Sequence, residues 1–347
     1  MTNRLKNIQV AVLLPATFLF LLFSSGCGSK QSGEEWVYLE GATMGTSYHI
    51  KMLTNLNEEE AKHVVDSTLI EVNRALSTYD TTSFISLFNR KEIPLNLDSL
   101  MISSAFQHFV KVWTKSVGVY LQTNGAFDPT ASELFNLWGF GEEKRQNFPS
   151  QHEVDAARNH VPFRYLSLYS DLNEIVYPPV NFNAVAKGYG VDVVMEALVA
   201  TGMTHGMVEI GGEVSVKGLN PQHQAWKIGI NRPFEGASVD DYAVVKELTN
   251  SAMATSGNYR QFFYHDGQKY SHTIDPRTGY PVQNEVLSTT IVANECAIAD
   301  ALATAGMVVG VEGLRTILRE SVGVKAILIV VDDALPEGYR IVELTSP

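Results

Sequence analysis

The sequence predicts an α+β fold in which mixed or antiparallel sheets pack against helices, arranged as two lobes of one unit. Segments typical of helices and of strands alternate along the chain without a steady βαβ rhythm, which disfavours a doubly wound parallel sheet. The chain has 347 residues, of which 45% are hydrophobic. That length and composition suffice for a substantial hydrophobic core.

Helices are predicted where apolar residues recur on one face. Capping residues mark several ends: Asp98 precedes a helix that includes Trp113, Pro129 suits a first turn, and Gly202 suits a C-terminal cap. The predicted helices cover residues 58–76, 98–113, a segment starting at 129, 185–199, 297–309 and 311–319.

Strands are predicted where apolar and polar residues alternate, as in residues 46–53. The other predicted strands cover residues 165–169, 174–177, 206–210, 226–231, 261–265, 287–292, 325–331 and 339–344. Two glycine-containing segments give weaker signals. IGGEV (210–214) suggests a bulged strand, and ATSGNYR (254–260) suggests a plain turn.

The N-terminus has the pattern of an export signal. A basic start and an apolar run lead to small residues directly before Cys27. This order predicts a bacterial lipoprotein signal peptide over residues 1–26, with Cys27 as the lipidated first residue of an exported, membrane-anchored protein facing the periplasm. A flexible tether over 27–35 then leads to the main domain, 36–347. The alternative is an ordinary signal peptide that happens to contain a cysteine.

Charge and motif content exclude several classes of function. The net charge of -12, without a Lys/Arg cluster beyond the first residues, opposes binding to nucleic acid. Zinc chemistry is disfavoured because the sequence contains neither HExxH nor a Cys/His cluster. A serine hydrolase is disfavoured because GxSxG does not occur. If Cys27 carries lipid, Cys296 has no disulfide partner.

Asp300 and Thr304 are polar residues in the otherwise apolar segment 295–310. Their spacing of four places them on one face of a helix. A buried charge must be paired, hydrogen-bonded or bound to a metal. Carboxylate and hydroxyl oxygens together suit a hard cation such as Mg²⁺. The alternative is a helix end or a narrow solvated stripe.

His272 begins the segment HTIDPRTGYP, residues 272–281. Asp275, Pro276 and Gly279 in this segment are typical of a turn. A neutral imidazole just before the turn could accept a proton from an attacking hydroxyl. A purely structural histidine is the competing interpretation.

Two further segments contain candidate ligand-binding residues. In NGAFDPT (124–130), Asp128 either caps the helix that follows or contacts a ligand, and both can hold. In NFNAVAKGYGVD (181–192), Lys187 and Gly188 lie near a helix start, where a lysine and main-chain N–H groups would suit a phosphate. A surface lysine at a helix start is the alternative. Neither GxxxxGK[ST] nor GxGxxG is present.

In chain order, these segments resemble the FAD:protein FMN transferase family, also called the ApbE family. The matching segments are GATMGTSY (41–48), STYDTTSFISLFN (77–89), GAFDPT (125–130), NAVAKGYGVD (183–192), GG (211–212), TSGNYR (255–260), HTIDPRTGYP (272–281) and ADALATA (299–305). The resemblance covers almost the whole chain after the tether. It implies an ApbE-like, T-fold-related domain that forms a single catalytic unit.

The resemblance also implies roles for individual residues. Contacts to flavin or adenine are implied for Met44, Tyr79, Ala126, Phe127, Asp128, Asn181, Lys187 and Ile274. Mg²⁺ is implied to bind Asp300, Thr304 and the main-chain carbonyl of Ala184. Asp300 and His272 are the expected catalytic residues, His272 as a base. Family members often carry an acidic residue and a Gly-Gly pair in the stretch where this chain has Asn181, Asn183 and Ala184.

The implied reaction moves FMN from FAD onto a Ser or Thr hydroxyl of a target protein, through a phosphoester bond, and releases AMP. Implied acceptors are flavoprotein subunits of membrane electron-transfer complexes, of the Na⁺-translocating NADH:quinone reductase or Rnf type. Two alternatives stay open. One is an FAD pyrophosphatase that produces FMN and AMP, and the other is a flavin-binding lipoprotein without enzymatic turnover.

Overall fold

The computed structural model describes residues 33–93, 102–140, 148–158, 163, 179–234, 236, 238, 240–258, 262–265 and 268–347. Residues Glu34–Pro347 form one compact unit. The predicted signal peptide, most of the tether and the predicted strands 165–169 and 174–177 lie outside the described residues.

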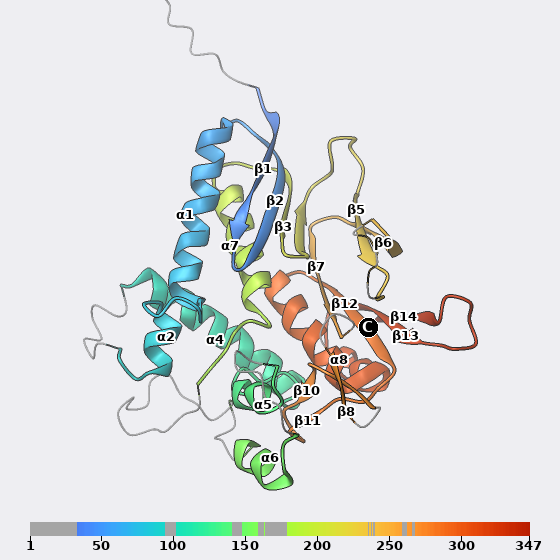
Figure 1. Cartoon of the computed structure of the whole chain (residues 1–347). Helices are drawn as coiled ribbons and strands as arrows, with labels where there is room; N and C mark the ends of the chain where they lie inside the picture. The colour runs from blue at the N-terminus through green and yellow to red at the C-terminus, as the bar shows by residue number, and fades with distance from the viewer. Residues whose placement is uncertain are drawn as a thin grey trace, which may run out of the picture. The chain divides into compact units, whose positions relative to one another are not determined.

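The elements are shown in Figure 1. The described strands are β1 (Glu35–Thr43), β2 (Thr46–Thr54), β3 (His205–Ile210), β4 (Glu213–Lys217), β5 (Trp226–Asn231), β6 (Tyr242–Leu248), β7 (Ser251–Gly257), β8 (Phe262–His265), β9 (Gln268–Ser271), β10 (Ile274–Asp275), β11 (Tyr280–Pro281), β12 (Val286–Ala293), β13 (Lys325–Val331) and β14 (Tyr339–Thr345). The described helices are α1 (Glu58–Leu76), α2 (Phe84–Asn89), α4 (Ser104–Gln122), α5 (Ser132–Leu137), α6 (Gln151–Arg158), α7 (Ala186–Ala200) and α8 (Cys296–Arg319).

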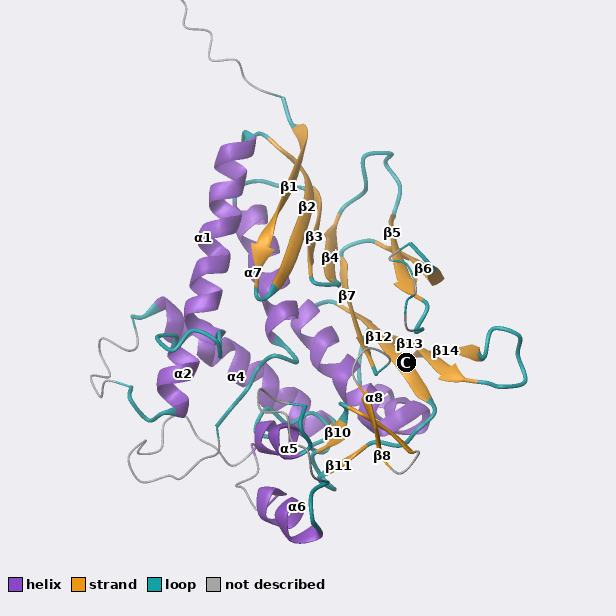
Figure 2. Ribbon diagram, in the orientation of Figure 1, coloured by secondary structure: helices purple, strands orange, loops and turns teal. Residues whose placement is uncertain are grey.

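Eight strands form one sheet in the order β1-β2-β3-β4-β7-β12-β13-β14 (Figure 2). Every neighbouring pair in it is antiparallel. Three two-stranded ribbons, β5-β6, β8-β9 and β10-β11, complete the described strands. The predicted α+β class with antiparallel sheets is therefore confirmed.

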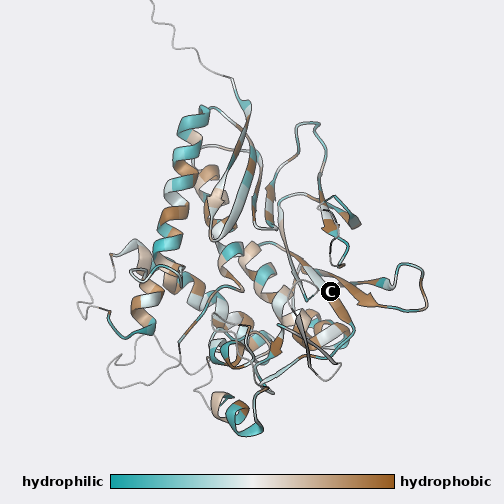
Figure 3. Cartoon of the chain, viewed as in Figure 1, coloured by the Kyte–Doolittle hydropathy of each residue, from teal (hydrophilic) through white to brown (hydrophobic). Residues whose placement is uncertain are grey.

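Helices α1, α7 and α8 bury their apolar faces against the large sheet. The β5-β6 ribbon forms a separate hydrophobic cluster with residues of β4, β7 and β13. Strand β13 lies in the interior of the protein because its sequence is apolar. Its five central residues, AILIV, are all buried, and its two end residues are exposed. The hydrophobic colour of this strand in Figure 3 follows that pattern. In the ribbon's cluster, Trp226 packs with Val216 of β4 and Ile329 of β13.

Helix α1 has the predicted bounds because its start is fully capped. Asn57 accepts a hydrogen bond from the Glu60 N–H, and the Glu60 side chain accepts one from the Asn57 N–H. The helix predicted to start after Asp98 begins instead at Ser104, because Ser103 caps it; Asp98 lies outside the described residues. The helix predicted to start at residue 129 begins at Ser132.

Helix α8 confirms the predicted pair of helices, because Gly310 interrupts it with φ 69°. Such a backbone conformation strains any residue with a side chain. By length and composition, this helix could span a membrane, but 67% of its apolar window is buried within the protein. Its residues instead belong to the largest core cluster.

Two weaker predictions were wrong, and both corrections concern the functional site. Residues 210–214 are not a bulged strand but a β3-β4 hairpin, in which Gly211 and Gly212 turn with φ of 60° and 105°. The segment 254–260 is not a plain turn, because Ala254 to Gly257 end strand β7. Glu35, assigned to the tether, already belongs to strand β1, which the sequence analysis did not predict.

Candidate active site

A cavity of about 960 Å³ lies between α5, α7, α8 and the end of β7. This volume is at the upper end for sites that enclose small molecules and cofactors. The residues predicted as site residues that line it are Tyr79, Ala126, Phe127, Asp128, Asn181, Ala184, Lys187, His272, Ile274, Asp300 and Thr304. The fold thus brings together segments that are up to 225 residues apart, from Tyr79 to Thr304.

Met44 is the predicted site residue that is not among those lining the described cavity. It lies in the β1-β2 turn with φ 49°, and its side chain packs beside Gly190 of α7. It is partly buried against the hydrophobic core. Its contact with flavin therefore stays a prediction.

Asp300 lies on α8 and is 3% exposed. Its Oδ2 accepts a hydrogen bond of 3.1 Å from the Gly188 N–H in the first turn of α7. That N–H is one of the donors that a helix start leaves without a partner inside the helix. The two helices therefore meet at the predicted metal-binding carboxylate.

Gly188 is required by the contact between α7 and α8. A Cβ atom at this position would lie 2.4 Å from the Cys296 carbonyl oxygen and 2.9 Å from Ala297 Cα. Both neighbours are backbone atoms, so a side chain fits only if one helix moves.

We expect Gly188→Ala to lower the free energy of unfolding by about 1–3 kcal/mol, the usual cost of overpacking a core. The shift of α7 should also separate Asp300 from the Gly188 N–H, so ligand binding weakens too. Urea unfolding of the two proteins measures the first effect. Gly118→Ala, on α4 where a Cβ would meet nothing within 4 Å, is the matched control. Equal stability of the Gly188 variant and the native chain would contradict the close packing.

Asp192 forms a second contact between the same helices. Its Oδ1 accepts from the Cys296 N–H at 2.7 Å, and its Oδ2 accepts from the Ala297 N–H at 2.9 Å. Burial raises the pKa of Asp192 to about 6, because the carboxylate loses its contact with water. The two N–H groups and Lys115 lower the pKa only in part, and the negative charge of Glu295 raises it.

The pKa of Asp192 predicts a pH-dependent stability. The ordinary value is 3.8, so the folded state holds this proton more tightly than the unfolded chain. The free energy of unfolding should therefore fall as the pH rises from about 4 to about 6, by about 3 kcal/mol through this group. Asp192→Asn cannot ionise and should lack that part of the decline. Urea unfolding across this pH range tests it, and parallel curves for both proteins would contradict it.

Lys187 forms an ion pair with Glu213 of β4, with Nζ and Oε1 2.8 Å apart. The Glu213 side chain is 4% exposed, and its Oε2 has no hydrogen-bond partner among the described residues. The Lys187 side chain keeps 31% of its surface open and lines the cavity. Lys187 is therefore not the isolated surface lysine that the alternative interpretation assumed.

The electrostatics of this cluster favour an added cation. Burial raises the pKa of both Asp300 and Glu213. The negative charge of Asp300 raises the pKa of Glu213 further, and the positive charge of Lys187 offsets only part of this rise. Burial alone would lower the pKa of Lys187, but Asp300 and Glu213 together raise it above its ordinary value. Two buried carboxylates thus share one ammonium group, and the excess negative charge would be stabilised by a bound cation.

Oxygen donors for a hard cation lie around Asp300. Thr304 lines the cavity one helical turn further along α8, and its hydroxyl lies 3.2 Å from the Ser256 hydroxyl of β7. Ala184 lies in the turn before α7, which the Asn181 side chain shapes by accepting the Asn183 N–H at 2.8 Å. Within the described ranges, no three His, Cys, Asp or Glu side chains form a metal-binding group. A cation here would therefore depend on hydroxyl and carbonyl oxygens besides a carboxylate, a set that suits Mg²⁺.

His272 lines the same cavity, directly before the β10-β11 hairpin. Its ring packs edge-on against Phe140, with ring centroids 6.3 Å apart. The predicted turn is confirmed, since the Gly279 N–H donates to the Asp275 carbonyl at 2.7 Å and Gly279 has φ 81°. The hairpin thus presents an imidazole to the cavity.

The rest of the cavity lining separates into apolar and polar parts. Phe127 and Ile274 are buried apolar residues, whereas Tyr79 is 80% exposed at the edge.

Asp128 is not the helix cap that one interpretation proposed, because α5 begins only at Ser132. Its Oδ1 instead accepts from the N–H and the hydroxyl of Thr130, at 2.8 and 2.6 Å.

Glu213 and Ser256 are site residues that the sequence analysis did not identify. Glu213 follows the Gly-Gly pair and Ser256 lies in TSGNYR; both segments match the family, but neither residue was given a role from the sequence. An acidic residue within the apolar strand segment 213–216 was the available signal for Glu213. Its partner, Lys187, lies 26 residues away in sequence, so the ion pair depends on the tertiary fold.

The chain is similar in sequence to known FAD:protein FMN transferases. A sequence model of the ApbE family matches residues 44–328. The FAD:protein FMN transferase of Vibrio cholerae is 39% identical over 303 residues, covering 84% of this chain and 86% of that protein. That of Haemophilus influenzae is 33% identical over 288 residues, covering 79% of this chain and 81% of the relative.

Solved structures show the same fold. The flavin transferase ApbE from Vibrio cholerae superimposes with a TM-score of 0.74 at 35% identity, covering 90% of this chain and 98% of that one. The apo form of the Pseudomonas stutzeri flavinyl transferase ApbE gives a TM-score of 0.73 at 28% identity, covering 90% and 96%. Because the family model spans most of the chain and these relatives align over nearly their full length, the chain belongs to the ApbE family.

Proposed function

We propose that this chain is an FAD:protein FMN transferase that attaches FMN to a Ser or Thr hydroxyl of other proteins and releases AMP. The observation that carries the proposal is the buried cluster of Asp300, Glu213 and Lys187 on the cavity wall. Its charge suits a cation and a pyrophosphate together. The two relatives described above are FAD:protein FMN transferases.

The proposal includes Mg²⁺ held by Asp300, Thr304 and the main-chain carbonyl of Ala184. The donor set and the excess negative charge support this assignment. Bound there, Mg²⁺ would neutralise pyrophosphate charge and favour departure of the AMP group. Gly188 holds the Asp300 carboxylate in place through its N–H.

The chain's own residues then have defined tasks. The acceptor hydroxyl gives its proton to a ring nitrogen of His272, and its oxygen forms a bond to the phosphorus of the FMN half. The bond between this phosphorus and the bridging oxygen of the pyrophosphate breaks, and the bridging oxygen leaves with the electron pair as part of AMP. Lys187, fixed by Glu213, offsets charge on the phosphate oxygens. Phe127 and Ile274 supply an apolar wall for the rings.

The cellular setting is also a proposal. The N-terminal pattern supports export, cleavage after residue 26 and a lipid on Cys27 that anchors the 36–347 domain to the membrane on its periplasmic side. Acceptors in that compartment would be flavoprotein subunits of Na⁺-translocating NADH:quinone reductase or Rnf-type complexes. Metabolic labelling with palmitate, compared between the native chain and Cys27→Ser, tests the anchor.

One experiment tests the reaction. The mature chain is incubated with FAD, MgCl₂ and a candidate acceptor domain, and the products are analysed by mass spectrometry. An FMN adduct on the acceptor together with AMP supports the transferase. FMN and AMP without an adduct would show a pyrophosphatase, and intact FAD would show a flavin-binding protein without turnover.

A further inference from the structure

Helices α7 and α8 each carry a carboxylate that accepts hydrogen bonds from N–H groups at the start of the other helix. Asp192 of α7 accepts from the first two residues of α8, Cys296 and Ala297. In return, Asp300 of α8 accepts from Gly188 of α7. Each carboxylate thus caps the helix that it does not belong to.

The two contacts have the same spacing on both helices. Asp192 lies four residues after Gly188, and Asp300 lies four residues after Cys296. Four residues correspond to about one helical turn. The contacts therefore fix both the distance between the helices and their relative position along the axis, around the close approach at Gly188.

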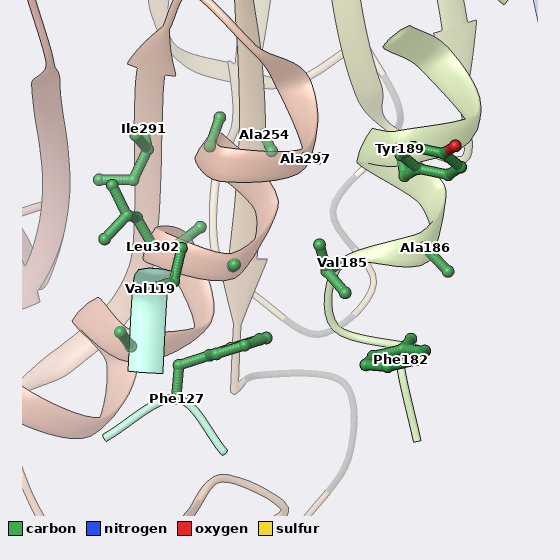
Figure 4. Packing of buried hydrophobic residues seen from close by; sticks show 14 of the residues in the cluster. Val119, Phe127, Phe182, Val185, Ala186, Tyr189, Ala254, Ile291, Ala297 and Leu302 are labelled. Atoms are coloured by element: carbon green, nitrogen blue, oxygen red, sulfur yellow. The ribbon is translucent and has the colours of Figure 1, made fainter. Parts of the chain in front are cut away.

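Local residues do not replace Asp192 in this role. The N-cap residue of α8 is Glu295, whose side chain pairs with Lys115 of α4. Helix starts favour carboxylates because the exposed N–H groups carry partial positive charge. Figure 4 labels Ala297 of α8 and Tyr189 of α7 among the residues of one core cluster, and the helices come closest at Gly188, so the interface is packed as well as hydrogen-bonded.

We propose that Asp192 is a positioning residue for the metal site. By holding the start of α8 against α7, it sets where Asp300 and Thr304 lie relative to Lys187, without contacting the ligand itself. This inference rests on the proposed function, since it assigns Asp192 to the cation that Asp300 and Thr304 would bind. Partners that orient metal ligands typically affect metal affinity by 10–100-fold.

The test compares Asp192→Asn and Asp192→Ala with the native mature chain, and uses Glu196→Gln as a matched control. Glu196 is exposed, one turn further along α7. MgCl₂ is titrated into each FAD-loaded protein by calorimetry, at pH 7.5 where the Asp192 carboxyl is ionised, and the KM for FAD is measured in parallel. Asn keeps the shape of the side chain but loses one acceptor, so it remains informative if the Ala variant does not fold.

The expected result is Mg²⁺ affinity about 10-fold or more weaker in both Asp192 variants. The KM for FAD at saturating Mg²⁺ and the properties of Glu196→Gln should stay near native values. Native Mg²⁺ affinity in a folded Asp192→Asn protein, whatever its stability, would overturn the inference, because the cap would then be structural only. If the native chain binds Mg²⁺ but transfers no FMN, the proposed function fails while the affinity comparison still decides the role of Asp192.

Discussion

Replacing Asp300 with Asn is expected to lower the rate of FMN transfer by about 10³-fold, because metal assistance in such reactions is worth several kcal/mol. The amide oxygen can still accept the Gly188 N–H, so the contact between α7 and α8 persists. The variant removes the charge that would hold the cation and leaves the shape of the site unchanged.

In the absence of ligand, the free energy of unfolding of the Asp300→Asn variant should be at least as large as that of the native chain. Burial raises the pKa of Asp300, which means that its charge destabilises the folded state. Rates at saturating and limiting MgCl₂, with thermal unfolding in parallel, measure both effects. Glu312→Gln, at an exposed position of the same helix, is the control. A transfer rate within tenfold of native would rule out Asp300 as a metal ligand.

Replacing His272 with Gln is expected to lower the transfer rate by about 10²–10⁴-fold at neutral pH, the usual contribution of a general base. FAD binding should change little, because the residue would act on the acceptor hydroxyl.

The rate of acceptor labelling at neutral pH, with FAD affinity measured by fluorescence, separates catalysis from binding. His63→Gln, at an exposed position of α1, is the matched control. A full transfer rate in His272→Gln would remove His272 from the mechanism and leave the cavity without its assigned base.

Local sequence patterns predicted the elements whose boundaries depend on nearby residues. Helix α1 was predicted with its observed bounds because the capping box and the apolar face lie within the segment itself. The break at Gly310 and the apolar strand β13 were predicted for the same reason. Strand β1 was not, because its exposed residues give little alternation and it forms by pairing with β2.

The residues of the candidate site likewise divide into those that local sequence predicts and those that it does not. Asp300 and Thr304 could be identified from sequence because a charge on an apolar helix requires an explanation within that helix. The acceptor role of Asp192 and the pairing of Glu213 could not, since their partners lie 104 residues away at Cys296 and 26 residues away at Lys187. Such contacts depend on how the helices and strands pack.

The strand order of the large sheet also determines when the site can form. Strand β7 lies between β4 and β12, and α8 follows β12 in the chain. Pairing strands that are distant in sequence is slow, because long loops must close before the contacts form. A growing chain contains Lys187 and Glu213 before it contains Asp300. Ligand binding therefore requires the last third of the chain, and the unfinished protein lacks a complete binding site.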